Sequence, residues 1–188
     1  MIGYEVWIDR SYWASSGGER IERARWQAAD GRLLDGQSVM EIQDVPHRLE
    51  TSWTVTDDGI AVRSLSGDED RSFHLPWDET PLADDRGLLV LIDLAAPWQL
   101  AAITLQPGTR GEAARFHPST WRPATQDSGP VIERWTVTVA GREQVTTPAG
   151  SFYAWRVTFG TDRTIWYDVN DRPVPVRFFN GIETWSMQ

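Results

Sequence analysis

The chain has 188 residues, of which 40% are hydrophobic and 24% charged, and its formal net charge is −9. It contains eleven tryptophans and no cysteine, and all eighteen of its basic residues are arginine. The acidic balance, with no basic stripe, argues against nucleic acid as a partner. The absence of cysteine and lysine excludes thiol nucleophiles, Cys-based metal sites, Schiff-base chemistry and a phosphate-loop lysine.

A chain of this length typically forms one domain, and we expect a single β domain over residues 1–188. No apolar stretch approaches the roughly 20 residues needed to cross a bilayer, so we expect no transmembrane segment. Residues 1–7 lack the basic and apolar regions of a secretory signal. We therefore expect a cytoplasmic protein if Met1 is the native start, and a trimmed exported protein otherwise.

The first third of the chain alternates polar and apolar side chains, which is typical of antiparallel strands joined by hairpins. This pattern predicts strands at residues 4–12, 21–28, 37–42, 45–55 and 60–65. The tightest hairpin is expected at Asp57, Asp58 and Gly59, because these residue types tolerate the positive φ of a short turn.

The middle of the chain is less regular. Residues 67–86 and 108–129 contain prolines and polar clusters, and they predict two long surface loops. Between them, residues 87–96 are almost continuously apolar, which fits either a short helix or a buried strand. Acidic residues before this run and Pro97 after it favour the helix.

Alternation returns in the last third, where hairpins are expected over about residues 130–188. Strands are predicted at residues 131–140, 144–147, 152–159, 165–168, 172–178 and 182–185. Residues 141–143 are expected to form a turn, and Pro148 and Gly150 are expected to end one strand and open the next. The chain as a whole is therefore predicted to be all-β and mainly antiparallel.

A series of motifs marks this last third. Thr147-Pro148-Ala149-Gly150-Ser151-Phe152 is followed by Ala154-Trp155-Arg156-Val157, then by Trp166-Tyr167-Asp168 and Pro175-Val176-Arg177-Phe178. This order resembles the C-terminal signature of a family of uncharacterised, β-rich and often exported bacterial proteins, over about residues 130–180. The resemblance implies a strongly curved sheet or an open half-barrel, wrapped over the apolar segment near residues 87–96. It implies no catalytic residue.

The first candidate site is a set of aromatic residues on predicted strands, with two arginines close to them in sequence. If these side chains share the concave side of a curved sheet, they would line a site for an apolar or amphipathic molecule. Aromatic residues favour strands in any case, so ordinary core packing is the alternative. The set comprises Trp53, Trp135, Tyr153, Trp155, Trp166, Tyr167, Arg156 and Arg177.

Acidic residues and histidines give the remaining candidates. Asp93 within the apolar run and Glu133 on the Trp135 side of its strand are candidate general acids, because burial raises the pKa of a carboxyl group. For Asp93 the alternative is an arginine partner or a helix-surface position. His47, His74 and His117 do not have the spacing of a compact ligand motif, so no metal is expected. No motif indicates a cofactor.

These patterns favour a protein that binds an apolar or amphipathic small molecule, lipid-like or polyketide-like, without transforming it. Two alternatives stay open. The first is a cyclase or isomerase that uses the same cavity with Asp93 or Glu133 as its acid. The second is a structural or protein-interaction module that presents a sheet edge or the long loops to a partner.

Overall fold

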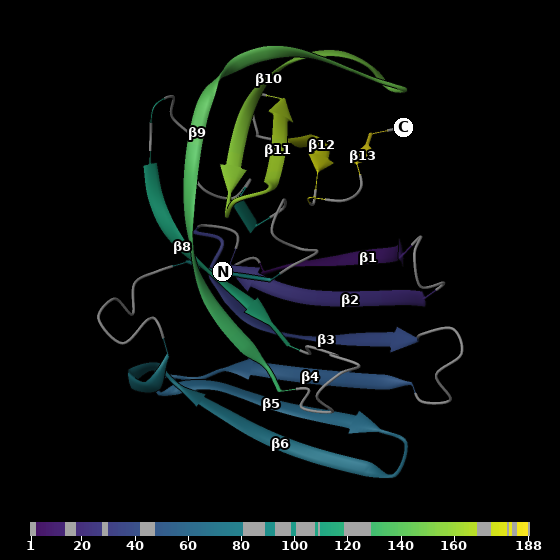
Figure 1. Cartoon of the computed structure of the whole chain (residues 1–188), viewed down its shortest axis with the longest axis vertical. Coiled ribbons are helices and arrows are strands. Elements are labelled where there is room, and N and C mark those ends of the chain that lie inside the picture. The colour runs from purple at the N-terminus through teal and green to yellow at the C-terminus, as the bar shows by residue number, and fades with distance from the viewer. Residues whose placement is uncertain are drawn as a thin grey trace.

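The structure of the protein is a computed structural model. It describes residues 3–13, 18–27, 30–41, 48–80, 89–92, 99–100, 108, 110–118, 129–168, 174–179, 181 and 184–187. Within these residues the chain is all-β, and its strands form two sheets (Figure 1). The all-β prediction is therefore confirmed. None of the helices in the described part of the chain is long and apolar enough to cross a membrane.

The first sheet is an antiparallel meander of six strands that lie in sequence order. Its strands are β1 (Gly3–Trp13), β2 (Gly18–Gln27), β3 (Leu33–Glu41), β4 (Leu49–Val55), β5 (Gly59–Ser66) and β6 (Glu69–Pro76). The predicted hairpin is confirmed, because β4 and β5 pair directly on either side of Asp57 and Asp58. Buried residues alternate along β4 and β5, as expected for a sheet with one wet face.

The predicted loop over residues 67–86 is wrong in its first half. Residues 69–76 form β6, which pairs along its length with β5, and Trp77–Glu79 form a 3₁₀ turn. Phe73 and Leu75 are two positions apart on β6 and both pack against the core. This alternating pattern is short, and the charged residues at the start of β6 make it difficult to recognise in the sequence. Charges and a terminal proline are common on edge strands, because they discourage further pairing.

The second sheet has seven strands in the order β13-β12-β11-β10-β9-β8-β7. Its strands are β7 (Leu89–Ile92), β8 (Arg110–His117), β9 (Val131–Thr147), β10 (Gly150–Phe159), β11 (Arg163–Asp168), β12 (Val174–Phe179) and β13 (Thr184–Ser186). All neighbours are antiparallel except β7 and β8, which are parallel. The strands predicted in the last third are thus largely confirmed.

Three predictions for this sheet are corrected by the structure. Residues 89–92 of the apolar run form β7 rather than a helix, since a continuous apolar run also suits a strand buried on both faces. Residues 110–117 form β8 rather than a loop; its buried residues Ala113, Ala114 and Phe116 are mostly small and give a weak signal. The expected turn at residues 141–143 is absent, because β9 continues through a bulge opposite Arg156.

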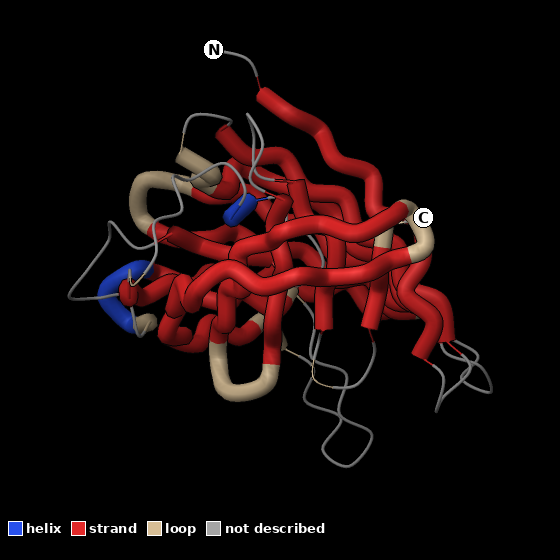
Figure 2. The backbone as a smooth tube through the Cα atoms, turned by 90° about the horizontal axis from the view of Figure 1, so that it is seen from above, coloured by secondary structure: helices blue, strands red, loops and turns tan. Residues whose placement is uncertain are grey.

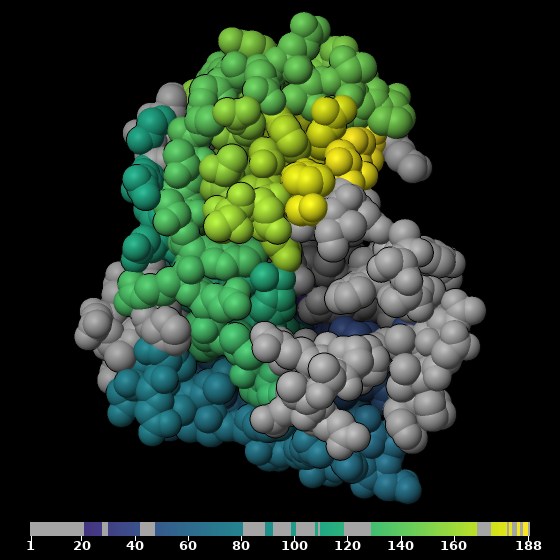
Figure 3. Space-filling view, viewed as in Figure 1, coloured from purple at the N-terminus to yellow at the C-terminus, as the bar shows by residue number. Residues whose placement is uncertain are grey.

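The two sheets share a hydrophobic core. Trp53 of β4 meets Phe116 of β8 edge-on, with ring centroids 5.7 Å apart and planes at 74°. Ala114 and Ile132 of the second sheet are buried in the same cluster as Val62 of the first. Figure 3 shows the outcome: β10 and β11, in yellow-green, and β12, in yellow, form the upper part of the molecule with the upper end of the green β9, and β4 to β6, in blue, form the lower part.

The second sheet curls into a half-barrel at its upper end. Beyond the bulge in β9, the β9–β10 hairpin bends over so that its turn lies beside the C-terminal strand (Figure 2). The amide of Ala149 donates a 3.3 Å hydrogen bond to the carbonyl of Met187, and the guanidinium of Arg177 donates to the carbonyl of Thr146. These bonds connect β9 and its turn to β12 and to the residue that follows β13. The curled sheet therefore has an enclosed inner side at this end.

Candidate functional site

Three of the predicted site residues lie in one row on the inner side of the curl. Arg156 of β10 pairs with Trp166 of β11, and Trp166 pairs with Arg177 of β12. Directly paired residues of antiparallel strands share a face, so the indole lies between two arginines. The guanidinium of Arg177 is 5.8 Å from the centroid of the Trp166 ring, within the range of a cation–π interaction.

Glu143 of β9 completes the polar part of this row. Its Oε1 accepts a 2.6 Å hydrogen bond from Nε1 of Trp166, and its Oε2 lies 3.8 Å from a guanidinium nitrogen of Arg156. Both the Arg156 and the Glu143 side chains are nearly half exposed, at 47% and 44%. Because the pair is exposed, solvent screens it and its contribution to stability is small. The Arg156 guanidinium therefore keeps donors that can turn towards a bound anion.

An apolar surface adjoins the charged row. Ala154, Val145 and Val176 are buried and form its floor, and Phe152 and Trp166 pack against them while staying partly exposed. Val174 lies on the same face, because it pairs with Asp168, which pairs with Ala154, and it is 43% exposed. We name the whole arrangement the tip site, and it consists of Glu143, Phe152, Arg156, Trp166, Val174 and Arg177.

The other predicted aromatics of the second sheet lie on its opposite face. Trp155 is 7% exposed and Tyr167 is fully buried, and both belong to the core cluster that also contains Val157. Burial raises the pKa of the Tyr167 phenol well above its usual value, so this hydroxyl stays protonated. Tyr153 lies two residues before Trp155 on β10 and is 61% exposed. The alternating pattern of β10 and β11 thus divides the predicted set between two faces.

Trp135 and Trp53 are held by further protein contacts. Two guanidiniums flank the Trp135 ring, that of Arg115 at 4.4 Å and that of Arg163 at 5.0 Å from its centroid. The Trp135 ring also packs against the ring of Phe159, with the two centroids 5.4 Å apart. Trp53 is 2% exposed within the core shared by the two sheets. These two indoles therefore contribute to packing in the structure.

The candidate acids and histidines do not converge. Glu133 is about half exposed and lies 3.8 Å from Arg115. Asp93 and His47 lie outside the described residues. His74 faces Asp58 on the surface, whereas His117 is at the end of β8. In the part of the chain that the structure describes, no three His, Asp or Glu side chains are grouped closely enough to hold a metal ion.

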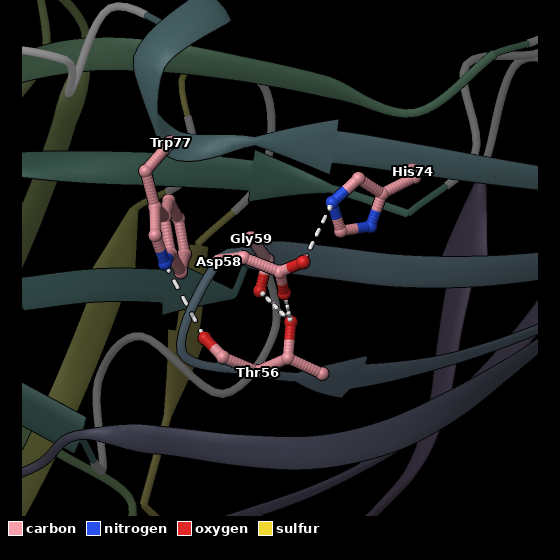
Figure 4. A network of polar contacts seen from close by, with 5 residues as sticks. All are labelled: Thr56, Asp58, Gly59, His74 and Trp77. Carbon is pink, nitrogen blue, oxygen red and sulfur yellow. Dashed lines mark hydrogen bonds and ion pairs between the residues drawn. The ribbon is translucent and has the colours of Figure 1, made fainter.

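A polar network at the β4–β5 turn contains a hydroxyl, a carboxylate and an imidazole (Figure 4). The Thr56 hydroxyl lies 2.7 Å from Oδ1 of Asp58 and 2.9 Å from the carbonyl of Gly59, and Nε2 of His74 lies 3.6 Å from the other carboxylate oxygen. A catalytic triad places the imidazole between hydroxyl and carboxylate, whereas here the carboxylate is central. The arrangement therefore fixes the turn and does not activate a nucleophile.

A depression of about 370 Å³ lies over β2, β3 and β4. Its polar walls belong to the outer face of the first sheet, because Arg25, Asp35 and Thr54 alternate with the buried Ala24 and Trp53. Arg25 and Asp35 form an ion pair within it, so their charges already compensate each other. An open polar surface of this kind is ordinary for an antiparallel sheet with one solvated side.

The curled sheet and its tip site define a β-rich protein of the half-barrel kind. Residues 92–179, which include most of the second sheet and five of the seven C-terminal strands in full, match the family described as a protein of unknown function, DUF3108. No curated protein and no solved structure matches the chain.

Sequence reasoning missed three members of the tip site, namely Glu143, Phe152 and Val174. The sequence predicts a turn at Glu143, and a turn residue has no predictable face. The bulge in β9 shifts the alternation, so that Glu143 and Val145 face the same side as Phe152 and Ala154. Only the pairing of β9 with β10 reveals this register, although a glycine inside an alternating run is a known sign of a bulge.

Proposed function

We propose that the tip site binds an amphipathic small molecule with an acidic head group and an apolar, lipid-like or polyketide-like body, and does not transform it. The observation that carries this proposal is the juxtaposition on one face of partly exposed apolar side chains, Phe152 and Val174, with the half-exposed guanidinium of Arg156. The described tip site offers no arrangement of a nucleophile with a base.

The chemistry of each part of the tip site supports this assignment. Apolar area removed from water contributes about 25 cal/mol per Å², so a hydrocarbon chain gains by covering Phe152, Val174 and the Trp166 ring. Arginine binds carboxylates and phosphates through two parallel N–H donors. Among the described residues, the charge partner of Arg156 is Glu143 at a long distance of 3.8 Å, so an acidic head group can compete with Glu143 for the guanidinium.

A binding experiment with a long-chain fatty acid tests the proposal. Titration into the full chain should change the intrinsic tryptophan fluorescence in a saturable way, because Trp166 lies in the site. Arg156→Gln should weaken binding about tenfold, as expected for the loss of about 1.4 kcal/mol from a charge-assisted hydrogen bond. Phe152→Ser should weaken it as well, through loss of apolar contact.

Arg142→Gln is the matched control. Arg142 lies on β9, the neighbour of the strand β10 that carries Arg156, and it stacks on a tryptophan at 4.3 Å from the Trp155 centroid, but on the opposite face of the sheet. Binding should be unchanged in this variant. A flat fluorescence response at saturating fatty acid, or equal weakening by Arg142→Gln and Arg156→Gln, would reject the tip site as the binding surface.

A further inference from the structure

The large apolar side chains that the described part of the chain leaves exposed all lie at one end of the second sheet. They are Tyr153 on β10, Val174 at the start of β12 and Met187 just after β13, with exposures of 61%, 43% and 44%. The amide of Ala149, in the β9–β10 turn, donates to the carbonyl of Met187, so the turn and the segment after β13 lie side by side (Figure 1). We name the three exposed side chains the apolar end.

A row of arginines lies directly behind the apolar end. Arg156 pairs with Trp166, and Trp166 pairs with Arg177. Arg142 pairs with Trp155, the residue next to Arg156. The three arginines therefore stand at one level across β9, β10 and β12, and all three are exposed or partly exposed. We name them the arginine row.

The apolar end projects beyond the arginine row towards the β9–β10 turn. β10 and β12 both start at this end of the sheet, and on each strand the exposed apolar residue comes three residues before the arginine. Met187 follows Ser186, which is the cross-strand partner of Arg177. Residues 144–153, which form the end of the hairpin, contain no charged side chain, although 24% of the chain is charged. The protein is thus uncharged and apolar at the hairpin end and basic one level behind it.

The charges at this end differ in sign from those of the chain as a whole. Two carboxylates, Glu143 and Asp168, lie beside the arginine row, since both pair with Ala154. Three arginines therefore outnumber two acids among the described residues at this level, in a chain whose net charge is −9. This local excess of positive charge complements a negatively charged surface.

The arrangement fits a lipid bilayer better than a flat protein partner. Tyr153 and its neighbour Phe152 leave opposite faces of β10, and both are at least partly exposed. A flat partner covers one face of a hairpin, whereas a bilayer surrounds an inserted end on all sides. Tyrosine is enriched at the membrane–water interface. Arginine can lay its stem on apolar surface while its guanidinium binds a phosphate group.

We propose that this end of the protein docks on the surface of a phospholipid bilayer that contains anionic lipid. Tyr153, Val174 and Met187 enter the interface, and the arginine row lies at the level of the headgroup phosphates. The proposal goes beyond the tip site, because Tyr153 and Met187 do not belong to that site and docking requires no bound ligand. Docking would place the tip site next to a reservoir of the amphipathic molecules proposed for it.

Flotation of the full chain with vesicles tests the proposal. The wild type should float with vesicles of mixed phosphatidylcholine and phosphatidylglycerol, and less with phosphatidylcholine alone, because anionic lipid attracts arginine. The double variant Tyr153→Ser/Met187→Ser should bind the mixed vesicles about tenfold less tightly, since less apolar area enters the interface. Leu65→Ser is the matched control and should bind like the wild type, because Leu65 is a partly exposed apolar residue on β5 of the first sheet.

A fluorescent label gives a second readout that does not depend on removing apolar contacts. The chain has no cysteine, so an introduced thiol can be labelled at one position with an environment-sensitive dye. Ala149→Cys places the dye in the β9–β10 turn, and Ser72→Cys places it on β6 of the first sheet; both residues are exposed. Mixed vesicles should shift the emission of the dye at position 149 to the blue and should leave the dye at position 72 unchanged.

Two measurements separate docking from the tip site. Arg142→Gln should weaken vesicle binding about fivefold, as expected for one arginine near an anionic surface, while its fatty-acid binding stays unchanged. The double variant Tyr153→Ser/Met187→Ser should likewise keep its fatty-acid binding. Docking is therefore lost in variants that retain the tip site.

Four outcomes would overturn the proposal. The wild type might fail to float with mixed vesicles, the double variant might bind as tightly as Leu65→Ser, or the dyes at positions 149 and 72 might respond equally. The fourth is a dimer in size-exclusion chromatography that the double variant dissociates, because a second copy of the chain would then be the occupant of the apolar end.

Discussion

The indole of Trp166 on β11 reaches across the intervening strand β10 to donate its 2.6 Å hydrogen bond to Glu143 on β9. Ala154 is the residue of β10 that pairs with Glu143, and it is fully buried beneath this contact. Because the side chain of Ala154 is a single methyl group, the Trp166 ring can extend over it towards Glu143. The bond therefore joins two strands that are not neighbours and fixes the indole on the inner side of the curl.

Breaking this bond should lower stability modestly. Glu143→Leu should reduce the free energy of unfolding by about 1 kcal/mol, a typical net value for one hydrogen bond at a partly exposed position. Glu143→Gln should lose less, because its amide oxygen still accepts from the indole. Urea unfolding of both variants, alone and combined with Trp166→Phe, measures the coupling energy. Fully additive effects of Glu143→Leu and Trp166→Phe would show that the bond does not contribute.

The small size of the Ala154 side chain should be necessary for the contact between Trp166 and Glu143. Ala154→Leu places three extra carbons beneath the Trp166 indole, and overpacking of a filled site costs about 1–3 kcal/mol. We expect a lower unfolding temperature and a change in the indole N–H signal of Trp166, as the ring is pushed away from Glu143. Ala149→Leu is the control, since Ala149 is exposed in the hairpin turn. The explanation fails if Ala154→Leu leaves the Trp166 signal in place.

Much of the fold could be predicted from the sequence, because half-buried strands repeat every two residues. The hairpin at Asp57 to Gly59 and the strands around Trp155 and Trp166 follow this rule. The rule failed where a strand is short and buried on both faces, as in β7, and where charges cover an edge strand, as in β6. From the residue types alone, a short buried strand such as β7 cannot be distinguished from a helix, and a charged edge strand such as β6 cannot be distinguished from a loop.

The candidate site was harder to predict for a geometrical reason. The set of aromatics was correctly placed on strands, but a side chain's face depends on register, and register depends on bulges. The bulge in β9 near Gly141 decides that Glu143 meets Trp166. Trp155 and Trp166 lie on opposite faces because Arg156, the neighbour of Trp155 on β10, pairs with Trp166, and only the structure reveals this pairing.

Gly36 is expected to be intolerant of any side chain. A Cβ atom there would lie 2.3 Å from the carbonyl oxygen of Arg23 and 2.3 Å from Cζ2 of Trp53. One of these contacts is with backbone, so it cannot be relieved by a rotamer change, and Gly36→Ala should destabilise the protein by about 3 kcal/mol or more. Gly141→Ala is the matched control, because no atom of the described part of the chain lies within 4 Å of its Cβ position. Equal unfolding temperatures for the two variants would contradict this account.

The turn that joins β4 to β5 should make stability depend on pH through Asp58. The Thr56 hydroxyl, the residue's own backbone N–H and, to a smaller degree, His74 lower the pKa of the Asp58 carboxyl below its ordinary value of 3.8. A carboxyl with a lowered pKa in the folded state stabilises the protein fully above the unfolded value, and this contribution disappears as the pH falls through the folded pKa. The wild type should therefore be more stable than Asp58→Asn near neutral pH.

Urea unfolding at a series of pH values checks this expectation. The difference in midpoint between wild type and Asp58→Asn should be constant above pH 3.8 and shrink below it. Asp57→Asn, in the same turn, is the control, because the described residues give the Asp57 side chain no hydrogen bond or ion pair, and its midpoint should stay close to the wild type. A difference between wild type and Asp58→Asn that persists at the lowest pH would mean that Asp58 acts through turn geometry rather than through its charge.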